Sequence, residues 1–210
     1  YCMDNFGTKE TNDLIFYYDP VEYRYDEIDK ISDYAQQYWE SLENKYKVKI
    51  DNKNKAYIFL YKDKNVSDSL YVNVPFSTKV KYHNDYINLV WSDDDKVTIM
   101  HELTHIFDMK YLFGIKSLFT EGLAQYNSNN KKDIYSFNYL LNYMEDNSTD
   151  EELFENYKNS KYETNYYFGH YFVEYLEETL GIDGFIKLAK ENSDEKIFDY
   201  FKIWLNDARE

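Results

Sequence analysis

Residues Val97–Tyr126 read VTIMHELTHIFDMKYLFGIKSLFTEGLAQY and contain the two most informative motifs of the chain. These are an H-E-x-x-H pentapeptide, formed by His101, Glu102 and His105, and a second short segment, T-E-G-L-A, that contains Glu121. On a helix, positions four residues apart differ by about 40° of rotation and about 6 Å of rise. The two imidazoles therefore project from one face of a helix, where they can bind a single ion.

The chemistry of the pentapeptide favours zinc. Zinc accepts histidine nitrogen and carboxylate oxygen at about 2.0–2.2 Å, and in catalytic sites water takes the fourth position. Glu102 directly follows the first histidine, which suits a general base beside that water better than a ligand. The alternative is a helix with two surface histidines and no metal. Apolar neighbours such as Ile99, Leu103 and Ile106 predict instead a helix buried on most sides, where polar side chains need partners.

Composition and charge argue against some classes of binding partner. The chain has 24 Lys and Arg residues against 39 Asp and Glu, a net charge of -15, which argues against nucleic acid or an anionic membrane surface. This charge is compatible with cationic peptides, although a solvated acidic surface is the commoner reason for it. No apolar run is long enough to span a bilayer. The only cysteine is Cys2, which excludes a disulfide within the chain and a cysteine zinc site.

The first part of the chain has the pattern of a small sheet with a helix. Short apolar runs at Leu14–Tyr18, Lys55–Tyr61 and Tyr86–Trp91 predict strands. Apolar residues at helical spacing over Tyr23–Tyr46 predict an amphipathic helix, and the polar residues Tyr1–Asp13 are expected to form a tail. Weaker strand patterns lie at Leu70–Val74 and Lys79–Tyr82.

The sequence from Lys96 onward predicts helices. The metal helix is expected over Lys96–Lys110, and Thr120 is expected to cap a second helix that begins at Glu121. Gly181 is expected to break the last long helical pattern. The other expected helices are Asp133–Glu145, Thr149–Tyr157, Glu163–Leu180, Ile182–Glu191 and Ser193–Ala208.

Together these patterns predict an α+β fold in a single domain, 1–210. A lobe of about 1–126, with a small mixed sheet and helices, would hold the zinc site, and an all-helical lobe of about 127–210 would follow. The H-E-x-x-H helix is expected at the floor of a cleft between them. Aromatic residues make up 20% of the chain, so an aromatic-filled core is expected.

The two motifs together resemble those of a known family. His-Glu-Leu-Thr-His followed by Thr-Glu-Gly-Leu-Ala-Gln-Tyr is similar to the gluzincin metallopeptidases, the thermolysin and aminopeptidase N group, and most of all to their compact peptidase MA-like domains. The resemblance implies that His101, His105 and Glu121 bind one zinc ion and that Glu102 is the catalytic base. The pentapeptide is not followed by a third histidine in the pattern H-E-x-x-H-x-x-G-x-x-H, which argues against a metzincin.

Two more polar residues lie near the motifs. Asp108 comes three residues after His105, where it is badly placed to complete a tetrahedral site. We expect it either to hydrogen-bond near the ligands or to carry surface charge. Gln125 lies one turn after Glu121 and could hydrogen-bond a ligand histidine, which would fix its tautomer.

A third motif, Asn-Tyr-Tyr-Phe-Gly-His at 165–170, offers a donor for the oxyanion that forms in amide hydrolysis. In the aminopeptidase N branch a tyrosine three residues before a glycine has this role, and Tyr166 stands in that relation to Gly169. In the thermolysin branch the donor is a histidine, so His170 is the alternative. Tyr166 could also be one more core aromatic.

The predicted function is zinc-dependent hydrolysis of peptide or protein substrates, whose backbone would pair with an edge strand within Leu70–Tyr82. The chain lacks the G-x-M-E-N signature of aminopeptidases, so endopeptidase cleavage is favoured. The alternative function is a zinc-containing domain that binds peptides or proteins and has lost or marginal proteolytic activity. The sequence leaves the oligomeric state and localisation open. Secretion or a cell-surface location would agree with the many exported stand-alone members of such families.

Overall fold

The computed structural model describes residues 6–48, 55–62, 76–81, 84–90, 96–112, 115–128, 142, 149–159, 163–191 and 193–209. The chain divides into two compact units, Tyr1–Tyr111 and Leu112–Glu210. The H-E-x-x-H pentapeptide lies in the first unit and the E-G-L-A segment in the second.

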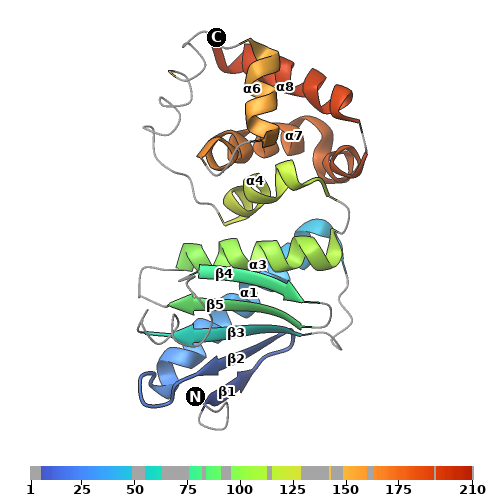
Figure 1. The fold of residues 1–210 in the computed structure, drawn as a ribbon. Helices are drawn as coiled ribbons and strands as arrows, with labels where there is room; N and C mark the ends of the chain where they lie inside the picture. The colour runs from blue at the N-terminus through green and yellow to red at the C-terminus, as the bar shows by residue number, and fades with distance from the viewer. Residues whose placement is uncertain are drawn as a thin grey trace. The chain divides into compact units, whose positions relative to one another are not determined.

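The first unit contains a five-stranded sheet with the strand order β1-β2-β3-β5-β4 (Figure 1). The β2–β3 and β3–β5 pairs are parallel, whereas β1 and β4 pair antiparallel at the two edges. The sheet is therefore mixed, and with the helices described below it confirms the predicted α+β class. The strands are β1 Gly7–Glu10, β2 Leu14–Tyr18, β3 Ala56–Tyr61, β4 Phe76–Lys81 and β5 Asn84–Val90.

The central strands form because their residues alternate between two faces. In β2 and β3 the buried residues of one face pair across the ladder, as Phe16 does with Ile58. On the other face Tyr17 stacks on Phe59, with ring centroids 4.9 Å apart. The predicted strands here, and those at Lys79–Tyr82 and Tyr86–Trp91, are confirmed with small shifts of their bounds. The predicted strand Leu70–Val74 lies outside the described residues.

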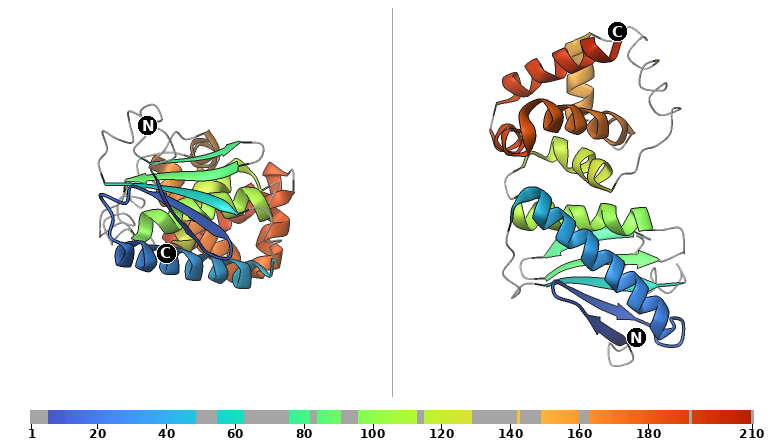
Figure 2. Two further views of the ribbon diagram at one scale, coloured as in Figure 1. Left: turned by 90° about the horizontal axis from the view of Figure 1, so that it is seen from below. Right: turned by 180° about the vertical axis from the view of Figure 1, so that it is seen from behind.

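Two helices complete the described part of the first unit: α1 over Tyr25–Tyr46 and α3 over Lys96–Tyr111. α1 crosses one face of the sheet (Figures 1 and 2). Trp39 of α1 packs edge-on against Phe107 of α3, with centroids 5.5 Å apart, and both side chains are buried. This aromatic contact anchors the H-E-x-x-H helix to the rest of its unit.

All the regular secondary structure described in the second unit is helical. An aromatic cluster fills its core, in which Tyr157 stacks on Phe201 at 5.6 Å and the rings of Phe172 and Trp204 lie close by. The fully buried Tyr157 hydroxyl donates to the carbonyl of Leu118 at 2.8 Å, so its polar end is satisfied. The aromatic core is therefore confirmed. The helices are α4 Ser117–Asn127, α6 Asp150–Asn159, α7 Glu163–Lys190 and α8 Asp194–Arg209.

The predicted break at Gly181 is also confirmed. Gly181 interrupts α7 with φ 68° and ψ 166°, a conformation that only glycine adopts without strain. The predicted helix Asp133–Glu145 lies outside the described residues, apart from position 142. None of the described helices is both long enough and apolar enough to cross a lipid bilayer.

The predicted N-terminal tail was wrong in part. Residues Gly7–Glu10 form β1, which pairs antiparallel with β2. The strand has no apolar alternation because it lies at the sheet edge and is held by backbone hydrogen bonds. An ion pair of 2.6 Å between Lys9 and Asp29 of α1 adds to this attachment.

The predicted start of the second motif helix was also wrong. α4 begins at Ser117, one turn before Glu121, and Lys116 is its N-cap. The hydroxyl of Thr120 donates to the carbonyl of Ser117 at 2.9 Å, inside the first turn. The helix starts early because Leu118 and Phe119 are buried against the core of the second unit.

Candidate metal centre

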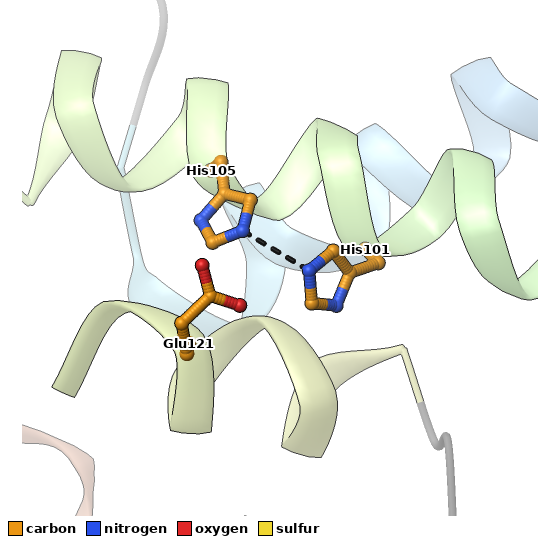
Figure 3. A group of neighbouring side chains, drawn as sticks. All are labelled: His101, His105 and Glu121. Carbon is orange, nitrogen blue, oxygen red and sulfur yellow. Dashed lines mark hydrogen bonds between the residues drawn. The ribbon is translucent and has the colours of Figure 1, made fainter. Parts of the chain in front are cut away.

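α3 presents two histidines on one face, as the four-residue spacing predicts. The Nε2 atoms of His101 and His105 lie 3.1 Å apart (Figure 3). His101 is buried and His105 is half-buried. Both imidazoles thus aim the same ring nitrogen at one point.

This separation matches what one zinc ion requires. Zinc–nitrogen bonds of 2.0–2.1 Å at a tetrahedral angle place two ligand nitrogens about 3.3 Å apart. The Nε2 atoms of His101 and His105, at 3.1 Å, need only a small shift to reach that value. An ion between them would replace the hydrogen bond that now joins the two rings.

Glu121 of α4 is the third member of the group. One ligand atom from each of His101, His105 and Glu121 lies within 4.8 Å of the others, and Figure 3 shows the three side chains as one group. Two imidazole nitrogens and one carboxylate oxygen form a donor set that zinc accepts, with one coordination position left open. The chemistry of these three residues therefore suits one bound metal ion such as zinc.

A hydrogen bond from α1 reaches α3 between the two histidines. The Thr104 hydroxyl donates to the carbonyl of Met100 at 2.9 Å, and the Tyr38 hydroxyl of α1 lies 2.6 Å from the Thr104 oxygen. Because threonine has one hydroxyl proton, Tyr38 must donate to Thr104. Burial raises the pKa of Tyr38, which keeps this donor protonated. These hydrogen bonds hold the residue between the two histidines in place.

Two further polar residues of α3, Glu102 and Asp108, are candidates for a role at the metal centre. Glu102 is half-buried beside His101 and is not one of the three grouped residues, so its role as base stays a prediction. Asp108 is 4% exposed, which makes the surface-charge interpretation wrong. It lies seven residues after His101 and three after His105, on the same stripe of the helix. A buried carboxylate needs polar partners, and a hydrogen bond near the ligands stays a prediction.

On α4, Gln125 is buried, one turn after Glu121 and on the same face of the helix. This placement agrees with a polar group beside the ligands, and its hydrogen bond to a histidine stays a prediction.

The oxyanion-donor candidates both belong to α7. Position 166 lies in this helix, but the Tyr166 side chain lies outside the described residues and its role stays a prediction. His170 is 4% exposed, and its ring packs edge-on against Tyr126 of α4, with centroids 5.7 Å apart. Burial first, and then nearby carboxylates including Glu177, raise the pKa of Tyr126 to about 12. Tyr126 therefore stays neutral beside the histidine at physiological pH.

One feature of α4 and α7 was not predicted from the sequence. The backbones of α4 and α7 meet at Gly122 and Gly169, where a Cβ atom on Gly122 would lie 2.4 Å from the carbonyl atoms of Gly169. The signal was present in the sequence, since each of the two motifs contains a glycine beside a candidate site residue.

Comparison with known proteins adds no family assignment. No protein-family model matches the chain, and no curated protein matches it. Function is therefore inferred from the residues and geometry described above.

Proposed function

We propose that the chain is a zinc-dependent metallopeptidase of the gluzincin type, which cleaves internal bonds of peptides or proteins. The observation that carries the proposal is the group formed by His101, His105 and Glu121, with ligand atoms within 4.8 Å of one another. The H-E-x-x-H order supplies a carboxylate, Glu102, directly beside the first of these residues.

Each residue has a distinct role in the proposed reaction. His101, His105 and Glu121 would hold the ion. Bound zinc would polarise the scissile carbonyl and lower the pKa of the attacking water to about 7. Glu102 takes a proton from that water and transfers it to the leaving amine. Tyr166, or alternatively His170, donates a hydrogen bond to the oxyanion.

The edge strand β4 is consistent with a peptide as the substrate. Among the described residues, β4 pairs only with β5, so one side of the strand has no backbone partner there. α3, which carries the two histidines, contacts this strand. An extended peptide could add to such an edge through backbone hydrogen bonds. This mode of binding accepts a chain that continues in both directions, which favours endopeptidase cleavage.

Cleavage of a diverse peptide mixture, with and without a zinc chelator, tests the proposal. We expect cleavage within peptides that the chelator abolishes and added zinc restores. Glu102→Gln should retain the metal but lower the rate by about 10²–10⁴-fold, because it removes the general base. Glu151→Gln, at an exposed position of α6, is the matched control and should cleave like the wild type.

Two results would contradict the proposal. Full activity of a zinc-loaded Glu102→Gln variant would remove the base from the mechanism. Zinc binding without any chelator-sensitive cleavage would favour the alternative function, a zinc-containing domain that binds peptides or proteins.

A further inference from the structure

The backbones of α4 and α7 touch at two glycines. A Cβ atom built on Gly122 would lie 2.4 Å from both the carbonyl carbon and the oxygen of Gly169. A Cβ atom on Gly169 would lie 2.7 Å from Gly122 Cα. Real Cβ atoms essentially never come closer than 3.0 Å to such neighbours, so neither position has room for a side chain.

Backbone conformation does not explain why these positions are glycine. Both lie inside helices, and the glycine with a positive φ among the described residues is Gly181. Alanine is the better helix former at such positions. The requirement for glycine at 122 and 169 therefore comes from the close approach of the two helices.

Both glycines adjoin residues of the proposed site. Gly122 directly follows Glu121, and Gly169 directly precedes His170 and lies three residues after Tyr166. Because each helix is rigid over one turn, the distance between the two backbones sets how far the α7 residues stand from Glu121.

A second pair of contacts depends on the same helix separation. Tyr126, one turn after Gly122, packs its ring against His170. The Glu177 carboxylate of α7 also lies close enough to the Tyr126 hydroxyl to raise its pKa. Both contacts would weaken if the helices moved apart.

We propose that Gly122 and Gly169 are positioning residues for the zinc site. Their backbone contact holds residues 166–170 of α7 at the separation from Glu121 that catalysis requires. The inference rests on the proposed function, because it assigns the two glycines to the same reaction.

Gly169→Ala and Gly122→Ala test this role, with Gly184→Ala as the matched control. A Cβ atom at position 184 would meet Leu180 of α7 at 2.9 Å and no atom of α4 within 4 Å. Zinc affinity is measured by competition with a chromophoric chelator, and kcat and KM with a cleaved peptide at saturating zinc.

We expect both test variants to lower kcat by about 100-fold, the effect of a displacement near 1 Å in an active site. KM should change much less. Zinc affinity should fall about tenfold, as it does when residues that orient ligands are changed. Gly184→Ala should keep wild-type kcat and zinc affinity. The double variant should lose less than the product of the two single losses, because the first alanine already separates the helices.

Wild-type kcat and zinc affinity in Gly169→Ala would overturn this inference and leave the proposed function standing. A wild-type protein that binds no zinc would overturn both. Should the alanine variants not fold, the backbone contact is tested in the wild type by the nuclear Overhauser effect between the α protons of Gly122 and Gly169. Its presence with and without zinc supports the contact, and its absence contradicts it.

Discussion

The hydroxyl chain from Tyr38 through Thr104 to Met100 predicts an unusual order of stabilities. Thr104→Val should destabilise the protein more than Tyr38→Phe, and the double variant should be more stable than Thr104→Val alone. The reason is the direction of the bonds. Thr104 donates to the carbonyl of Met100, so the Tyr38 hydroxyl donates to Thr104 across 2.6 Å.

The size of each change in the free energy of unfolding depends on which buried group loses its hydrogen-bond partner. Tyr38→Phe removes one buried hydrogen bond and leaves no donor unsatisfied, at a cost of about 1 kcal/mol. Thr104→Val removes the bond to Met100 and also leaves the Tyr38 hydroxyl buried without an acceptor, so the cost is about 2–3 kcal/mol. In the double variant the stranded hydroxyl is gone, and about 1 kcal/mol of that cost is recovered.

Urea unfolding followed by circular dichroism measures these differences, with the free energy of unfolding taken by linear extrapolation. Tyr25→Phe is the matched control, because Tyr25 lies on the same helix and is 68% exposed. It should unfold like the wild type. If the double variant is less stable than Thr104→Val by the full Tyr38→Phe increment, the two sites are independent and the reasoning is refuted.

Two further predictions concern pH. Burial lowers the pKa of Lys110 from 10.5 to about 8. The folded state therefore loses this proton before the unfolded state, and wild-type stability relative to Lys110→Met should rise between about pH 8 and about pH 10.5. Urea midpoints across that range that run parallel for the two proteins would contradict the shift. Hydrogen bonds from Lys116 and then Lys158 lower the pKa of Asp194 from 3.8. The stability that Asp194 adds over Asp194→Asn, under about 1 kcal/mol for a half-exposed group, should be present above about pH 4 and lost on further acidification. Thermal melts in which that difference does not shrink as the pH falls below 4 would show that the carboxylate is not responsible.

Local patterns predicted the elements whose residues determine them directly. The apolar run Leu14–Tyr18 became a strand with the same bounds, and Gly181 broke its helix. β1 could not be predicted, because its four residues GTKE pair through the backbone and carry no apolar pattern. The start of α4 was missed because the burial of Leu118 and Phe119 outweighs the capping preference of Thr120.

In the candidate metal site, too, local geometry was predictable from the sequence, whereas contacts between helices were not. The convergence of His101 and His105 follows from helix geometry alone, and the structure places their Nε2 atoms 3.1 Å apart. The burial of Asp108 and the contact between Gly122 and Gly169 depend on which helices pack together. Spacing along the chain does not show which helices pack together, although each of the two motifs carries a glycine beside a candidate site residue.

Zinc binding by the metal-free protein is the decisive measurement for the proposed metal site. Titration against a competing chelator should give one zinc ion bound per chain. His105→Ala should weaken that binding by more than about 100-fold, since even residues that only orient ligands account for 10–100-fold. Wild-type zinc affinity in His105→Ala would show that His101, His105 and Glu121 do not form the metal site.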